Sequence, residues 1–183
     1  MPLLPLRTPR LRLREFRLED APDIMRLNAE PSTRRGLPSH VYRDIDEATQ
    51  AMGFLIACVA SPGDPRRGPY VLAVEHGQTR ELLGHVGGSP LDGEVEVSYA
   101  IAEAWRGHGY GTEALACFCE RLSAAFGLSS LIAVTALENA RSRRLLERAG
   151  FVHACDETMA FQGTQRDVSR YRWRSPNLND ARV

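Results

Sequence analysis

EVEVSYAIAEAWRGHGYGT, residues 94–112, is the stretch that decides the fold. Its first eight residues have the composition and alternation of a strand, and the turn after them opens a long helix with apolar residues at helical spacing. Gly107, Gly109 and Gly111 let backbone N–H groups approach a ligand closely, because glycine carries no side chain. The positive end of the helix dipole faces the same place. Strand, glycine turn and helix start together predict a phosphate-binding cradle.

This glycine turn differs from the two common nucleotide-binding motifs. A P-loop requires Gly-Lys followed by Ser or Thr, and the turn contains no Lys. A dinucleotide-binding turn reads Gly-x-Gly-x-x-Gly, whereas the third glycine comes one residue early here. What remains is Arg-x-x-Gly-x-Gly, built on Arg106, Gly109 and Gly111. A glycine-rich connection without a ligand is the alternative that this spacing leaves open.

The composition is that of an ordinary globular chain. Its 183 residues suffice for one domain with a sizeable core, and 43% of them are apolar. Basic and acidic residues number 23 each, so there is no net charge to attract nucleic acid. The sequence contains neither an apolar run of membrane-spanning length nor a signal-peptide pattern. We therefore expect a cytoplasmic monomer or homodimer without nucleic-acid or membrane partners, with one domain over 1–175 and a polar tail over 176–183.

The metal-binding residue types show no metal-ligand spacing. Cys58, Cys117, Cys119 and Cys155 form no Cys-x-x-Cys pair, and the five histidines are scattered. The thiols are interpreted as buried or half-buried apolar groups, and no metal site is expected.

The rest of the chain predicts strands and helices in a mixed order. The expected strands cover about 11–16, 70–76, 81–90, 94–101, 131–135, a strand from Phe151, and 166–173. The expected helices follow Asp20, follow Asp44, and cover about 109–126 and 139–149, the last with Gly150 as its C-cap. Residues 31–43 read as a loop. This order predicts an α+β fold: a mixed, mostly antiparallel sheet of about seven strands with about four helices.

Four segments between residues 8 and 151 carry a family resemblance. They are the Arg-x-x-Gly-x-Gly turn, Thr8-Pro-Arg-Leu-Arg-Leu-Arg14, Glu96-Val-Ser-Tyr-Ala-Ile101, and the helix that reads Asn139-Ala-Arg-Ser142 and ends in Glu147-Arg-Ala-Gly150-Phe151. Together they resemble the GNAT superfamily of acetyl-coenzyme A-dependent N-acetyltransferases, most closely the ribosomal-protein N-terminal (alanine/serine) acetyltransferase branch. The resemblance implies a GNAT-type sheet that is splayed between its fourth and fifth strands.

The resemblance also implies direct transfer of acetyl from acetyl-CoA to a primary amine, within one ternary complex and without a metal. The implied cofactor-binding residues are Tyr99, Ala100, Ile101, Arg106, Gly107, His108, Gly109, Tyr110, Gly111, Thr112 and Asn139. The oxyanion donor is expected to be a backbone N–H near Val97 or Ser98. Two of these residues have plain structural alternatives, because Tyr99 can be a core aromatic and Asn139 a helix N-cap.

Glu96 and Ser142 are the expected catalytic residues. A carboxylate inside a splayed sheet has a raised pKa, which suits Glu96 for the role of base. Glu94 lies on the same strand face and is its competitor, as is water. Ser142 is expected to contact the thiol sulfur, or else to pack as a small residue. Many superfamily members carry a Tyr seven residues after the helix Asn, and here that position is Leu146.

Ser98, Ala100 and His108 depart from the family pattern and leave open a non-catalytic acyl-CoA-binding module. A nucleotide phosphotransferase is not favoured, because the turn lacks both the Lys and paired acidic Mg²⁺ ligands.

The acceptor is constrained by the cost of removing a proton from the amine. An α-amine, with a pKa of about 7.7–8.0, loses its proton more easily than a lysine near 10.4. A protein or peptide N-terminal α-amine or a small polar amine is therefore favoured, with an antibiotic or polyamine as the alternative. Segments 31–44 and 157–166 are expected to line the acceptor pocket. The first contains Arg34, Arg35, His40 and Arg43, which either favour an acidic acceptor or are simply solvated.

Overall fold

The computed structural model describes residues 4–37, 40–61, 63–161 and 163–176. Its centre is one eight-stranded sheet in the order β1-β2-β3-β4-β5-β6-β8-β7. Every neighbouring pair in that order is antiparallel except β5–β6, which is parallel. The strands are β1 (Leu6–Arg7), β2 (Leu11–Arg14), β3 (Tyr70–His76), β4 (Leu82–Leu91), β5 (Glu94–Ile101), β6 (Ser130–Ala136), β7 (Val152–Phe161) and β8 (Thr164–Arg174).

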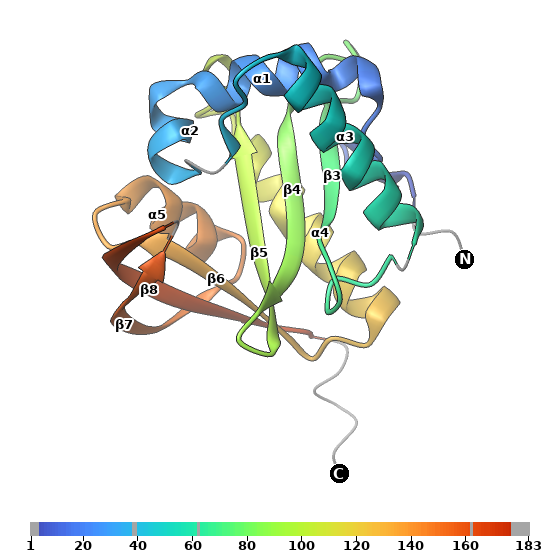
Figure 1. Cartoon of the computed structure of the whole chain (residues 1–183). Helices are drawn as coiled ribbons and strands as arrows, with labels where there is room; N and C mark the ends of the chain where they lie inside the picture. Colours follow the sequence, from blue (N-terminus) through green and yellow to red (C-terminus); the bar gives the residue numbers. More distant parts are fainter. Residues whose placement is uncertain (1–3, 38–39, 62, 162, 177–183) are drawn as a thin grey trace.

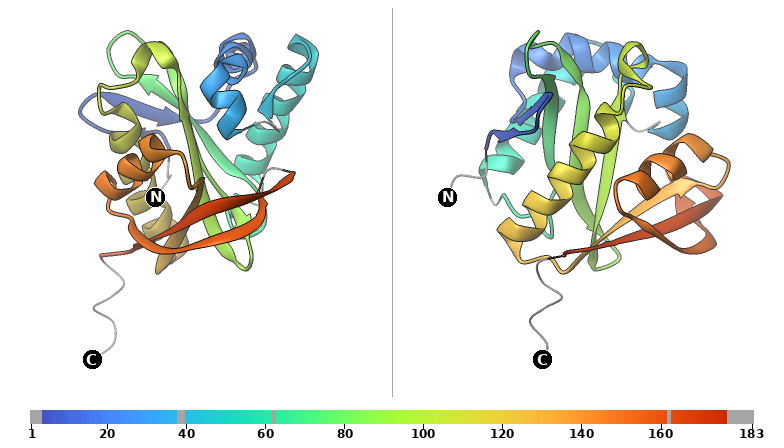
Figure 2. Two further views of the ribbon diagram at one scale, coloured as in Figure 1. Left: turned by 90° about the vertical axis from the view of Figure 1, so that its left-hand side faces the viewer. Right: turned by 180° about the vertical axis from the view of Figure 1, so that it is seen from behind.

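Helices cover both faces of this sheet (Figures 1 and 2). The α-helices are α1 (Ala21–Ala29), α2 (Pro31–Gly36), α3 (Ile45–Ala60), α4 (Tyr110–Phe126) and α5 (Ala140–Arg148), and the 3₁₀ turns are η1 (Leu18–Asp20) and η3 (Glu103–Trp105). α1 and α3 lie on one face, and α4 crosses the other (Figure 2). α5 lies beside the second part of the sheet, which consists of β6, β7 and β8 (Figure 1).

The sheet opens between β5 and β6, the fourth and fifth of the expected strands, as the family resemblance implies. β4 and β5 are paired along the whole of β5, from Glu94 to Ile101. β5 and β6 are paired only where Glu96 meets Ile132. Beyond that point the strands diverge, and a V-shaped gap separates their ribbons (Figure 1). The backbone of β5 after Glu96 therefore has an edge that β6 does not cover.

Two apolar clusters fix the sheet from its two sides. The first packs the predicted stripe of α4, including Leu115, Phe118 and Leu122, against the strands. The second lies under α1 and α3 and contains Ile24 and Met52. Because both faces of β3 and β4 are buried in this way, the first half of the sheet is a rigid support for β5.

Three expectations about the elements need correction. Residues Pro31–Gly36 form helix α2 instead of a loop, since Pro is well accommodated in the first turn of a helix. Leu6–Arg7 adds an eighth strand that is too short to produce an alternating pattern. Residues 157–166 belong largely to the hairpin of β7 and β8 instead of a loop.

The expected helix caps are only partly confirmed. Asp44 caps α3, because its carboxylate accepts a hydrogen bond from the Glu47 N–H at 2.9 Å. Asp20 stands at the N-cap position of α1, but its carboxylate accepts from the Arg17 N–H and pairs with Arg14 instead. The C-cap of α5 is Ala149, one residue before the predicted Gly150.

The four cysteines only partly match the expected burial. Cys119 is buried and Cys58 and Cys117 are half-buried as expected, whereas Cys155 is exposed because β7 lies at the sheet edge. None of the described helices combines the length and apolar character needed to cross a membrane. The expected tail falls outside the described residues from position 177 onward.

Candidate active site

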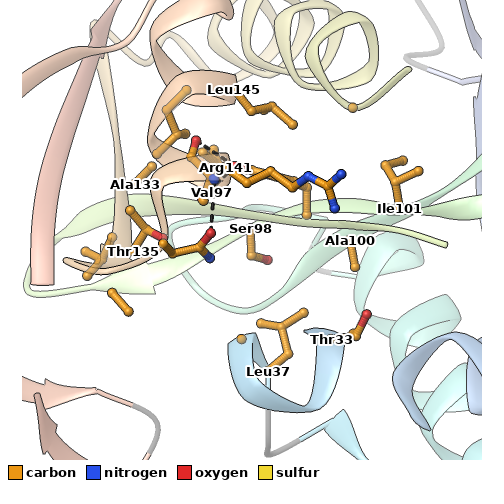
Figure 3. Close-up of a pocket in the computed structure, with 18 of the residues that line it drawn as sticks. Thr33, Leu37, Val97, Ser98, Ala100, Ile101, Ala133, Thr135, Arg141 and Leu145 are labelled. Carbon is orange, nitrogen blue, oxygen red and sulfur yellow. Dashed lines mark hydrogen bonds between the residues drawn. The ribbon is translucent and has the colours of Figure 1, made fainter. Parts of the chain in front are cut away.

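A cavity of about 930 Å³ occupies the opening between β5 and β6. α2, β5, β6, α5, the glycine turn and the β7–β8 hairpin all contribute to its walls. β5 divides the cavity into two sides, with Thr33 and Leu37 on one side and Arg141 and Leu145 on the other (Figure 3). A group attached to a ligand on the α5 side can therefore meet a second ligand on the α2 side beside β5.

The glycine turn offers a row of free backbone donors to this cavity. Gly107 and Gly109 adopt φ values of 84° and 82°, which glycine tolerates better than other residues. Within the described residues, no protein acceptor is assigned to the N–H groups of residues 107–112. A Cβ at Gly111 would lie 2.8 Å from Leu145 Cδ1, so a larger residue there would have to displace the end of the Leu145 side chain. The turn fits a diphosphate, because its amides and the start of α4 present positive charge without a competing side chain.

Arg10 holds this turn from outside the cavity, a role that the sequence reasoning did not assign. Its Nη1 donates to the His108 carbonyl at 2.9 Å, and its Nε donates to Glu113 Oε2 at 2.7 Å. Its guanidinium carbon lies 4.6 Å from the centre of the Tyr110 ring. The opening motif around Thr8 and Arg10 therefore supports the glycine turn. The presence of this motif in the sequence was the signal from which the role of Arg10 could have been inferred.

Glu96 and Glu94 point from the same strand face but have different surroundings. Glu96 is half-buried in the cavity wall, and burial raises its pKa to about 7 against the opposing effects of Arg170 and the Val134 N–H. Glu94 forms a salt bridge with Arg172, with Nη2 and Oε2 3.1 Å apart, and this hydrogen bonding lowers its pKa. Of the two carboxylates, only Glu96 combines a position in the cavity with a pKa suited to proton transfer near neutral pH.

The hydroxyls of Tyr99 and Ser142 meet at the α5 side of the cavity, with their oxygens 2.8 Å apart. Tyr99 also donates to the Ser142 carbonyl at 3.3 Å, and burial raises the pKa of Tyr99 to about 12. Asn139 is the N-cap of α5, because its Oδ1 accepts from the Ser142 N–H at 3.1 Å. Leu146 is buried, so the position of the missing Tyr faces the core.

The family model of the acetyltransferase (GNAT) domain matches residues 10–152, which is more than half of the chain. The chain belongs to the GNAT acetyltransferase family. This GNAT protein is thus an acetyl-CoA-dependent N-acetyltransferase. None of the curated proteins matches its sequence.

Solved structures share the fold of this GNAT domain at low sequence identity. An acetyltransferase from Agrobacterium tumefaciens is 24% identical, with a TM-score of 0.74 and 96% of each chain covered. RimL, a ribosomal L7/L12 alpha-N-protein acetyltransferase in complex with coenzyme A, is 15% identical with a TM-score of 0.77, covering 92% of this chain and 96% of that one. A spermidine N-acetyltransferase SpeG chimera from Vibrio cholerae and hSSAT is 20% identical with a TM-score of 0.73, covering 93% and 98%.

The Arg106 side chain of this GNAT domain is bound to other protein groups, whereas the family resemblance implies that it contacts the cofactor. Its Nε donates to the Ile101 carbonyl at 2.6 Å, and its Nη2 lies 2.8 Å from Glu30 and 3.1 Å from Thr33 Oγ1. Nη1 adds contacts with Ser32 and Glu103. These partners tie α2 to the end of β5, so the guanidinium is occupied within the protein. Its expected contact with the diphosphate stays a prediction.

The three residues that depart from the family pattern, Ser98, Ala100 and His108, lie in different surroundings. Ser98 lines the cavity, and Ala100 is buried there opposite His85 on β4. His108 stacks on Tyr110, with ring centres 5.8 Å apart. Among the described residues, no group of His, Cys, Asp and Glu side chains is arranged to hold a metal.

Proposed function

We propose that this GNAT domain acetylates the α-amino group of a protein or peptide N-terminus, or a small polar amine, by direct attack within a ternary complex. The observation that carries the proposal is Glu96, a half-buried carboxylate in the cavity whose pKa is raised to about 7. It stands where the two sides of the cavity meet, at the residue pair that joins β5 to β6 in the sheet.

Glu96 suits an α-amine better than a side-chain amine. A base works best when its pKa lies near that of the group it deprotonates and near the working pH. The pKa of an α-amine, about 7.7–8.0, is close to that of Glu96, whereas deprotonating a lysine amine with a pKa near 10.4 costs about 3.5 kcal/mol more. We infer that Glu96 accepts the proton of the attacking amine, directly or through one water.

The other residues of the cavity support the remaining steps. Acetyl-CoA supplies the activated acetyl group. The free N–H groups of residues 107–112 bind the diphosphate. A backbone N–H near Val97 or Ser98 stabilises the developing oxyanion at the uncovered edge of β5. Of the hydrogen-bonded Tyr99–Ser142 pair, one hydroxyl donates to the other, and the second donates a hydrogen bond to the sulfur that leaves.

The charges of the cavity disfavour a polyamine as acceptor. Among its described lining residues the carboxylates are Glu96 and Glu138, and Glu138 is paired with Arg166 at 2.7 Å. Arg35 of α2 lines the acceptor side and forms no ion pair within the described residues. A polycation would meet uncompensated positive charge there, whereas a neutral or acidic acceptor would not.

A thiol-release assay with acetyl-CoA tests this proposal. The amines are an Ala- or Ser-initiated peptide, the same peptide with its α-amine blocked and an internal Lys, spermidine, and an aminoglycoside. The chain contains no lysine, so acetylation of its own lysine side chains cannot contribute. We expect release mainly with the free α-amine, a loss of about 10²–10⁴ in Glu96→Gln, and little change in the matched control Glu94→Gln. Preferential release with spermidine or the aminoglycoside would reject the proposed acceptor class.

A further inference from the structure

Four basic side chains belong to α2 and to the segment that follows it, and their surroundings in the structure differ. Arg43 pairs with Glu47, with Nε and Oε2 3.2 Å apart, and it does not line the cavity. Arg34 is exposed and does not line the cavity either. Arg35 and His40 are the two that do line it. The sequence alone does not separate these four residues, whereas the structure leaves two of them in a position to meet an acceptor.

Of these two residues, Arg35 is the one that carries a permanent charge. Burial lowers the pKa of His40, whose ring centre lies 6.2 Å from that of the buried His85, so His40 is neutral near pH 7. A guanidinium group stays protonated throughout this range. Within the described part of the chain, the Arg35 side chain has neither an ion pair nor a hydrogen-bond partner. It therefore brings to the cavity a positive charge that these residues do not neutralise.

The backbone that carries Arg35 is held in place opposite β5. Arg106, which follows β5, has its Nη2 2.8 Å from Glu30 and 3.1 Å from Thr33 Oγ1, so it fastens the start of α2. Ser32 and Arg35 are three residues apart in this helix, which puts both on the face that lines the cavity. Figure 3 shows α2 facing β5 across the cavity. An acceptor that lies between these two elements therefore passes close to Arg35.

The carboxylates of the cavity wall do not serve as partners for Arg35. Glu138 is paired with Arg166 at 2.7 Å, and Glu96 is the proposed base, with a pKa raised to about 7. A guanidinium group recognises a carboxylate through two directed N–H donors, so a carboxylate on the acceptor is a suitable partner for Arg35. Charge complementarity of this kind distinguishes one acceptor from another.

We propose that Arg35 selects acceptors that carry a carboxylate close to the reactive amine, and that the preferred acceptor is a peptide N-terminus with Asp or Glu among its first two residues. The inference rests on the proposed function and narrows its acceptor class. Arg35 pairs with the acceptor and takes no part in proton transfer. Because such a pair forms in the bound acceptor as well as in the transition state, it should lower KM and leave kcat nearly unchanged.

Thiol release from acetyl-CoA with two matched pairs of peptides tests the proposal. One pair differs by Asp against Asn at the first residue, and the other by the same exchange at the second residue, after Ala. We expect the Asp peptide of at least one pair to have a kcat/KM about fivefold to tenfold higher, through KM. Arg35→Gln should bring this ratio to about one, and Arg35→Glu should invert it. Arg34→Glu is the matched control, because it makes the same charge change at an exposed neighbour outside the cavity and should keep the preference.

Three results would overturn the inference. Equal kcat/KM values for Asp and Asn in both pairs with the natural chain would show that Arg35 is simply solvated, and would leave the acetyl-transfer proposal intact. A preference that survives in Arg35→Gln would assign the recognition of the carboxylate to another group. Equal responses to Arg34→Glu and Arg35→Glu would assign it to the overall charge of α2. Thermal unfolding identifies any variant that does not fold, and if Arg35→Glu is one, Arg35→Gln decides. Absence of thiol release with all four peptides would reject the proposed function as well.

Discussion

The hydroxyl oxygens of Tyr99 on β5 and Ser142 on α5 lie 2.8 Å apart and join these two elements in the wall of the cavity. The two residues are 43 positions apart in the sequence. In the proposed function, this pair of hydroxyls supplies a hydrogen-bond donor to the leaving sulfur. The raised pKa of Tyr99, about 12, keeps its phenol protonated and able to donate throughout the neutral range.

Replacing Tyr99 by Phe should lower kcat by about tenfold to a hundredfold, because one donor to the leaving group is lost in the transition state. The Kd for coenzyme A should change less than threefold. Steady-state kinetics and titration calorimetry measure the two quantities. Ser142→Ala, which leaves the phenol in place, is expected to have a smaller effect. Unchanged kcat in both variants would show that Tyr99 and Ser142 only pack against each other and do not assist the leaving group.

Replacing Gly109 by Ala should weaken coenzyme A binding by about fivefold or more. Its φ of 82° is strained for alanine, and any relaxation moves the amides of the turn. Gly127→Ala is a matched control, because Gly127 has a φ of 65° and open space around it at the far end of α4. Both variants should lose about 1 kcal/mol of unfolding free energy, but only Gly109→Ala should change the Kd.

Replacing Arg106 by Gln distinguishes its two assigned roles. If the guanidinium joins α2 to β5, the variant loses about 1–3 kcal/mol of stability and its KM for the acceptor rises, because α2 lines the acceptor side. The Kd for coenzyme A should stay within about twofold. Thermal unfolding and calorimetry on one preparation give both values. A tenfold weaker Kd for coenzyme A with unchanged stability would instead show that Arg106 contacts the diphosphate.

Replacing Glu75 by Ala should destabilise the fold by about 3–5 kcal/mol, because it leaves a buried charge without one of its partners. Glu75 is only 1% exposed and bonds Arg14 Nε at 2.6 Å, and Arg14 also pairs with Asp20. Urea unfolding measures the loss. Glu19→Ala, at an exposed position nearby, is the control and should change stability by less than about 0.5 kcal/mol. A loss below about 1 kcal/mol in Glu75→Ala would show that Asp20 alone suffices for Arg14.

Local signals in the sequence account for most of the fold. The three strands between residues 70 and 101 are separated by strong turn signals, and the glycine turn marks the boundary between β5 and α4. Helix α2 was missed because Pro, Ser and Gly also make loops, and composition does not distinguish a short helix with Pro at its first position.

The contacts of the site were harder to predict where a side chain pairs with a residue far away in the sequence. The Arg106 guanidinium turns to Glu30, 76 residues earlier, and nothing in the turn itself indicates that choice. Likewise, Glu94 and Glu96 look equivalent along the strand, and they are distinguished by the salt bridge of Glu94 to Arg172 and by the position of Glu96 in the cavity wall. Such choices depend on the packed structure, so periodicity and spacing cannot reveal them.

The pH dependence of kcat/KM for a peptide with a free α-amine, compared between the natural chain and Glu96→Gln, tests the central claim most directly. Glu96 accepts a proton only when it is ionised, so activity should rise as the pH passes through its pKa of about 7 and approach a plateau once the amine is also deprotonated. Glu96→Gln should lose at least about a hundredfold and keep only the limb that belongs to the amine. An unchanged rate and an unchanged profile in this variant would contradict the account.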